Sequence, residues 1–149
     1  MREILFRGKR RDNREWVYGC YYKQTEFCGD KVEPFGIMII TSSESLCYDQ
    51  ALEYYAISEK TVGQFTGLTD KNGKKIFEGD IVRILGNQDV EDWRNVDYTA
   101  LIAFIDGGFC AIDGTEEEHG FRRYALARFD FSLEVIGNIH DNPELLENP

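Results

Sequence analysis

The sequence lacks the features that mark a membrane protein, a secreted protein or the commonest classes of enzyme. No apolar run approaches the ~20 residues that a membrane-spanning helix needs, and the basic N-terminus has no apolar segment typical of a secretory signal. No serine or cysteine stands in a G-x-S-x-G motif, and there is no glycine-rich phosphate loop. We therefore expect a cytoplasmic protein that is not an enzyme and has no membrane attachment.

Cysteine and histidine are few, and they are spaced too irregularly for a zinc site. The four cysteines and two histidines are Cys20, Cys28, Cys47, Cys110, His119 and His140. They form no C-x-x-C pair and match no spacing typical of zinc ligands. Since thiols stay reduced in the cytoplasm, the sequence predicts free cysteines and no metal.

Acidic residues gather around Asp89, Glu91 and Asp92, which raises the question of a divalent-cation site. An EF-hand loop needs glycine at its sixth position and glutamate at its twelfth. Counted from Asp89, those positions hold Arg94 and Ala100. The pattern therefore favours a solvated acidic loop, and we expect neither a metal nor any other cofactor.

The charge of the chain is uneven along its length. The net charge is −10, but residues 1–14 carry six cations against two carboxylates, which gives +4 and leaves −14 for the rest. A mainly acidic protein repels duplex DNA, so we expect no appreciable binding to it. The basic segment complements the acidic remainder within one subunit or between subunits, and the second option predicts a homo-oligomer.

Three residues are candidates for contact with a partner. Trp93 stands inside the acidic loop, where it is either a lid over one end of a barrel or an exposed anchor. Arg10 and Arg11 form the densest part of the basic segment. Tryptophan and arginine are enriched among the residues that dominate binding energy at interfaces.

The stretch 61–82 is the most informative part of the chain. Asn72-Gly73 predicts a hairpin with a two-residue type I′ turn, since both residue types tolerate positive φ. The polar residues beside the turn, Asp70 among them, are expected at a solvated tip. Gly79-Asp80 precedes a β-branched run, and we interpret Asp80 as a turn residue that bonds nearby backbone amides, not as a catalytic carboxylate.

The rest of the chain also predicts strands. Aromatic residues make up 13% of the sequence, and aromatic and β-branched residues favour strands over helices. Short runs with this composition lie at residues 2–8, 16–22, 35–41, 52–57, 98–105, 109–112, 121–131 and 133–139. We expect a mainly β fold with little helix: a β-rich unit at 1–60, then an SH3-like barrel at 61–149 with a short C-terminal helical turn that begins at Asn142-Pro143.

Several blocks of the sequence resemble the YopX family of bacteriophage and prophage proteins. They read ILFRGK at 4–9, WVYG at 16–19, TVGQFTGL at 61–68, DKNGK at 70–74, IFEGDIV at 76–82, LEVIGNIH at 133–140 and NPELL at 142–146. The blocks follow the family's order from one end of the chain to the other. The resemblance implies a phage or prophage origin and an SH3-like barrel in the second half, and it implies no catalytic residue.

The leading functional hypothesis is therefore a phage accessory protein of the bacterial cytoplasm that binds another protein, of the host or of the phage, without catalysis. The second hypothesis is a nucleic-acid-associated protein that uses the basic N-terminal segment, with Arg10-Arg11 as its principal contact.

Overall fold

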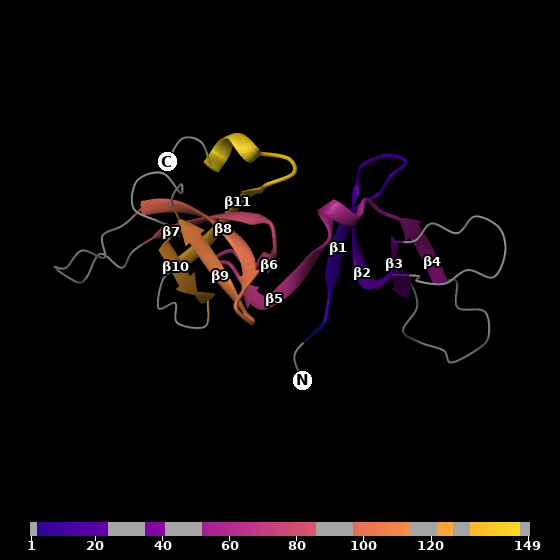
Figure 1. Ribbon diagram of the computed structural model, residues 1–149, viewed down its shortest axis with the longest axis horizontal. Helices are drawn as coiled ribbons and strands as arrows, with labels where there is room; N and C mark the ends of the chain where they lie inside the picture. The colour runs from indigo at the N-terminus through magenta and orange to yellow at the C-terminus, as the bar shows by residue number, and fades with distance from the viewer. Residues whose placement is uncertain are drawn as a thin grey trace. The chain divides into compact units, whose positions relative to one another are not determined.

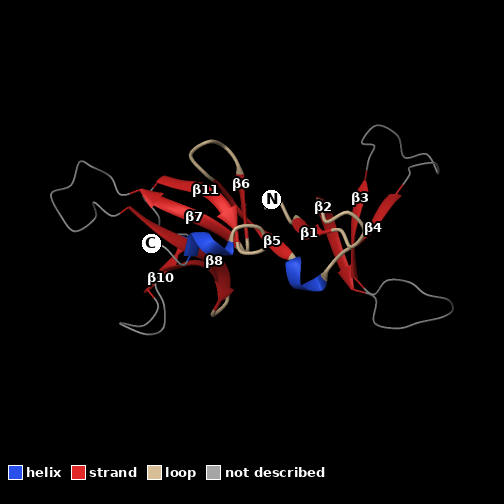
Figure 2. Ribbon diagram, turned by 90° about the horizontal axis from the view of Figure 1, so that it is seen from above, coloured by secondary structure: helices blue, strands red, loops and turns tan. Residues whose placement is uncertain are grey.

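The computed structural model describes residues 3–23, 35–40, 52–85, 97–113, 122–126 and 132–146. The fold is mainly β and consists of two antiparallel sheets, which confirms the expected fold class (Figure 1, Figure 2). The chain divides into two compact units, Met1–Phe65 and Thr66–Pro149. The boundary between them lies within strand β5. Within the described residues, no helix has the length and apolar character needed to cross a membrane.

The first unit is an antiparallel sheet in the order β4-β3-β2-β1-β5, and β6 (Lys75–Phe77) continues that sheet beside β5. Its elements are β1 (Phe6–Lys9), β2 (Trp16–Lys23), β3 (Phe35–Ile40), β4 (Leu52–Ala56), the 3-10 turn η1 (Glu59–Thr61) and β5 (Gly63–Thr69). Strand β1 therefore begins later than the sequence predicted. The other three predicted strands of this unit agree with the structure to within a residue or so.

The residues that follow β4 pair with the residues that follow β1. Arg10 forms an antiparallel bridge with Ile57, and the Arg11 N–H donates to the Ala56 carbonyl at 3.0 Å. The Ser58 N–H donates to the Lys9 carbonyl at 2.9 Å. These bonds fix the turn between β1 and β2 beside the end of β4, although the two segments are more than 40 residues apart in the sequence.

Among the described residues of the first unit, Ile37 and Ile57 are fully buried. Ile57 packs directly against Gly8, where an added Cβ would come within 2.7 Å of the Ile57 side chain. Glycine in β1 thus lets the β4 end approach closely, so these residues stabilise the pairing described above.

The second unit holds a five-stranded sheet in the order β10-β9-β8-β7-β11. The strands are β7 (Asp80–Leu85), β8 (Asp97–Ile105), β9 (Gly108–Asp113), β10 (Arg122–Ala125) and β11 (Ser132–Asn138), and the 3-10 turn η3 (Pro143–Leu146) follows. Its core consists of buried apolar residues: Ile76, Val82, Ile84, Ala100, Ile102, Ala111, Leu126 and Leu133. Pairing of the first strand with the last, β7 with β11, is compatible with the expected SH3-like barrel. Within the described residues the sheet is not closed.

The prediction of a type I′ turn at Asn72-Gly73 is wrong. Gly73 has a φ of 81°, but Asn72 does not have a positive φ. The Gly73 N–H donates to the Asp70 carbonyl, and the Asp70 N–H donates to the Lys74 carbonyl. This is the three-residue hairpin loop in which a type I turn ends on a left-handed glycine.

A two-residue turn with positive φ at both positions lies instead between β8 and β9. Asp106 has a φ of 52° and Gly107 a φ of 83°, and Ile105 pairs directly with Gly108. Aspartate-glycine satisfies the same conformational demand as asparagine-glycine.

Candidate functional site

Four aromatic residues form what we call the aromatic face: Trp16, Tyr18 and Tyr22 on β2, and Tyr54 on β4. Alternate residues of a strand point to the same side of a sheet, which groups the three residues of β2. The Tyr22 and Tyr54 rings lie 5.2 Å apart, so β4 contributes to the same side. Tyr18 is 45% exposed and Tyr54 is 38% exposed. The face therefore combines large rings with access to solvent.

Gly36 of β3 makes the contact between the two tyrosines possible. It pairs with Tyr22, while its neighbour on the same side of the strand, Met38, pairs with Tyr54. A Cβ at Gly36 would overlap the Tyr54 ring. The ring of Tyr54 therefore lies over the glycine and reaches Tyr22 across it.

Two cations of β1 pack against the Trp16 end of the aromatic face. The Arg7 guanidinium lies 4.7 Å from the centre of the Trp16 ring system, and the Lys9 ammonium lies 5.4 Å from it. Both residues are buried, with only 6% and 8% of their surface exposed. Cations held against a tryptophan face stabilise the sheet. Because both side chains are buried, a phosphate backbone cannot approach them closely.

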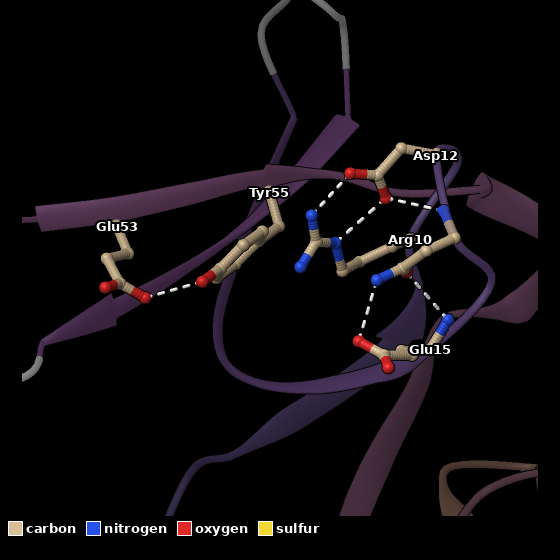
Figure 3. Close-up of polar contacts among 6 residues, drawn as sticks. Arg10, Asp12, Glu15, Glu53 and Tyr55 are labelled. Carbon is tan, nitrogen blue, oxygen red and sulfur yellow. Dashed lines mark hydrogen bonds and ion pairs between the residues drawn. The ribbon is translucent and has the colours of Figure 1, made fainter.

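Arg10 is held on two sides in the turn between β1 and β2 (Figure 3). Its Nε donates to Asp12 Oδ1 at 2.9 Å, and its Nη2 donates to Asp12 Oδ2. Its guanidinium also lies over the Tyr55 ring, 4.4 Å from the ring centre. The Tyr55 hydroxyl donates to Glu53 Oε2 at 2.5 Å. A continuous series of contacts thus links Asp12 and Arg10 in the turn to Tyr55 and Glu53 in β4.

The ionisation of these groups follows from their contacts. The hydrogen bonds that Asp12 accepts from Arg10 lower the pKa of Asp12 and raise the pKa of Arg10. The hydrogen bond to Glu53 raises the pKa of Tyr55, because that bond requires the phenol proton. Arg10 therefore stays charged and Tyr55 stays neutral across the physiological pH range.

A pocket of about 440 Å³ opens beside this cluster, and we call it the Arg10 pocket. Its lining residues are Arg10, Arg11, Asp12, Tyr54, Tyr55 and Ala56. Tyr54 lines the pocket, but Arg10 and Tyr55 lie on the side of the sheet opposite the aromatic face, because Tyr55 alternates with Tyr54 along β4 and Arg10 pairs with Ile57.

The structure brings together two of the three partner-contact candidates. Arg10 and Arg11 both line the Arg10 pocket, whereas Trp93 and the acidic loop around it lie outside the described residues. Sequence reasoning missed Tyr18, Tyr54 and the pocket itself. The alternation of aromatic residues in WVYGCYY was a usable signal for one side of the face, but nothing local predicts that β4 meets the first turn.

Asp70 is buried, which corrects its expected place at a solvated tip. It is 7% exposed, and its carboxylate accepts hydrogen bonds from the N–H groups of Asn72, Lys74 and Val135 at 2.8, 2.9 and 3.1 Å. Burial alone raises the pKa of Asp70, but these three bonds and the charge of Lys74 outweigh it, so the pKa lies below its ordinary value. Asp70 thus fastens the loop between β5 and β6 to β11.

Asp80 and Gly79 occupy the turn before β7. Asp80 is almost fully buried, and its Oδ2 accepts the Phe77 N–H at 2.8 Å. Gly79 has a φ of 80°, and its N–H donates to the Ile102 carbonyl. This geometry agrees with a structural role for Asp80. The part of the chain that the structure describes contains no group of three potential metal ligands.

Comparison with known proteins gives a family match over nearly the whole chain. A family model described as YopX protein matches residues 5–147, which confirms the resemblance seen in the motif order. Among solved structures, the crystal structure of protein EF1440 from Enterococcus faecalis is similar, with 22% sequence identity and a TM-score of 0.45 over 98% of this chain and 99% of that chain. No curated protein matches the sequence.

Proposed function

This chain belongs to the YopX protein family, and from that premise we propose that it is a phage- or prophage-encoded accessory protein that binds another protein without catalysis. The partner is a protein of the phage or of the bacterial host, and binding takes place in the host cytoplasm. The surface that makes the contact is the aromatic face of the first unit.

The exposure of Tyr18 and Tyr54 on one side of a sheet is the observation that carries this proposal. Tyrosine and tryptophan are intermediate in their preference for the interior, and together with arginine they are the residues most enriched among interface hot spots. Their two χ angles lose little entropy on binding, while each ring buries a large area.

The charges near the face favour a protein partner over a nucleic acid. Single-stranded nucleic acids also stack on aromatic residues, but that mode needs accessible cations along the phosphate path. Here Arg7 and Lys9 are buried against Trp16, and Arg10 is paired with Asp12. The chain as a whole carries −10, which opposes a polyanion.

Affinity capture from host lysate tests the proposal, with Tyr18→Ala as the variant that damages the face. Phe104→Ala is the matched control, because Phe104 is also an exposed aromatic strand residue, at 52%, but belongs to β8 in the second unit. We expect a protein, identified by mass spectrometry, that the wild type and Phe104→Ala both capture and that Tyr18→Ala captures at least tenfold less. Equal capture by all three forms contradicts a role for the face. Capture that nuclease treatment abolishes would support the nucleic-acid hypothesis instead.

A further inference from the structure

We propose that the Arg10 pocket is a carboxylate-binding site that receives an acidic side chain of the protein partner. The proposal rests on the proposed function, because it names the chemistry of that partner. Two properties of the pocket carry it: the fixed orientation of Arg10 and the apolar wall beside it.

Arg10 is oriented before any ligand arrives. Asp12 takes the Nε and Nη2 edge of the guanidinium, and the Tyr55 ring covers one of its flat faces. The other end of the guanidinium, with Nη1, points away from Asp12 (Figure 3). A guanidinium presents parallel N–H groups on that end as well, and they match the two oxygens of a planar carboxylate.

The supporting contacts come from the turn between β1 and β2 and from β4, so they resist rotation of the arginine. Tyr55 is restrained by its bond to Glu53, and the backbone next to Arg10 is bonded to β4 through Arg11 and Ala56. Immobilising a long side chain that is mobile beforehand costs conformational entropy on binding. Most of the ordering of the Arg10 side chain accompanies folding. Little of this entropy is therefore lost when a small planar anion binds.

The guanidinium of Arg10 selects an anion, and the walls of the pocket select one carried on an apolar stem. Arg10 and Arg11 are the cations that line the pocket, while Asp12 in the lining and Glu53 beside Tyr55 limit how much negative charge the site accepts. A phosphate brings more negative charge close to Asp12 and Glu53 than a carboxylate does, and the repulsion opposes it. The methylene groups of a glutamate or aspartate pack against the apolar wall of the pocket, which consists of the rings of Tyr54 and Tyr55 and the methyl group of Ala56.

A titration of the ¹⁵N-labelled full chain followed by NMR tests the pocket without knowledge of the partner. The probe is the capped peptide acetyl-Gly-Glu-Gly-amide, and acetyl-Gly-Gln-Gly-amide is its neutral counterpart. Acetyl-triglycine with a free C-terminus and inorganic phosphate distinguish a terminal carboxylate and a phosphate from a side-chain carboxylate. The signals observed are the Arg10 Nε–H and the backbone amides of Arg11 and Tyr55.

We expect saturable shifts with the glutamate peptide and at least fivefold weaker binding of the glutamine peptide. Arg10→Lys keeps the charge but loses the planar fork, so it should weaken binding at least fivefold while the β1 and β2 amide signals stay in place. Arg14→Gln is the matched control: Arg14 is an exposed cation of the same turn but does not line the pocket, and this variant should bind within twofold of the wild type.

Three results overturn the proposal. Equal shifts with the glutamine peptide show that charge is not recognised, and equal loss in Arg14→Gln shows a diffuse charge effect. Tighter binding of phosphate than of the glutamate peptide shows a different class of anion. The two proposals can fail separately: if Tyr18→Ala loses the captured protein while the glutamate peptide causes no shift, the protein-binding function stands and the carboxylate site does not.

Discussion

Replacement of Asp70 by asparagine tests how the loop between β5 and β6 is held to β11 in the sheet of the second unit. The two side chains are nearly the same size, so the change removes charge without creating a cavity. In the native protein Oδ1 accepts the N–H groups of Asn72 and Lys74, and Oδ2 accepts the N–H of Val135. An asparagine can keep the first two bonds, but its NH₂ group then faces the Val135 N–H, donor against donor.

The magnitude follows from the exposure of each donor. Asn72 and Lys74 are exposed residues whose amides can turn to water, so their weaker bonds to a neutral oxygen account for about 0.5 kcal/mol each. Val135 is half-buried in β11, and an unsatisfied amide there costs about 2 kcal/mol. The sum predicts that Asp70→Asn lowers the free energy of unfolding by about 3 kcal/mol, which corresponds to a fall in melting temperature of roughly 6–12 °C.

Urea denaturation monitored by circular dichroism gives the free energy, and hydrogen exchange at the Val135 amide locates the effect. Asp106→Asn is the control, because Asp106 is an exposed turn residue with a φ of 52° that asparagine tolerates well. The reasoning is wrong if Asp70→Asn unfolds within 0.5 kcal/mol of Asp106→Asn.

The pH dependence of the Asp70 effect has a definite sign. The folded-state pKa of Asp70 is lowered, so its contribution to stability is complete above the unfolded-state pKa, about 3.9. The contribution disappears as the pH falls through the lower, folded-state pKa. The stability difference between wild type and Asp70→Asn should therefore be constant near neutral pH and should shrink below about pH 4.

Four further predictions concern the turns, the aromatic face and the charges. Gly36→Ala should destabilise the protein by about 1–3 kcal/mol, because the new methyl group displaces the Tyr54 ring; prior replacement of Tyr54 by alanine should remove most of that cost in a double-mutant cycle. Gly73→Val should cost on the order of 1 kcal/mol through its φ of 81° alone, since nothing lies within 4 Å of its Cβ position; an unchanged melting midpoint would contradict this. Fluorescence anisotropy near 150 mM salt should show no duplex DNA binding in the micromolar range, and binding lost on replacing Arg10 and Arg11 by alanine would reverse the ranking of the two functions. Light scattering at low salt should give a mass above the 17.2 kDa of one chain and a lower mass as salt is added; a mass of one chain at low salt and high concentration contradicts the predicted homo-oligomer.

The strands were predictable from the sequence because their signals are local. Runs such as WVYGCYY and FGIMII contain enough aromatic and β-branched residues to identify β2 and β3 without any knowledge of their neighbours. The turn between β5 and β6 shows the limit of that reasoning. Asn72-Gly73 was expected to form a two-residue turn, but the Asp70 carboxylate accepts the N–H of Asn72 within the loop and the N–H of Lys74 after it, and thereby stabilises a three-residue loop.

The candidate site could be predicted only in part, because it depends on contacts between distant segments. Arg10 and Arg11 were identified from charge density alone. Their neighbours in the pocket come from β4, and the pairing of Arg10 with Ile57 has no local signature in the sequence. The burial of Arg7 and Lys9 was equally hidden, since a basic run normally indicates a solvated surface.

The placement of the N-terminal cations decides which kind of recognition they can serve. Affinity for a nucleic-acid backbone grows with the number of phosphates that mobile cations neutralise, and it needs no particular side-chain geometry. In this protein Arg7 and Lys9 are buried against Trp16, and Arg10 is fixed between a carboxylate and a ring. The negative charge of Asp12 cancels much of the field of Arg10, and a guanidinium held in one orientation matches the two oxygens of a planar carboxylate. We therefore expect the first hairpin to recognise an acidic protein segment and not to attract a polyanion.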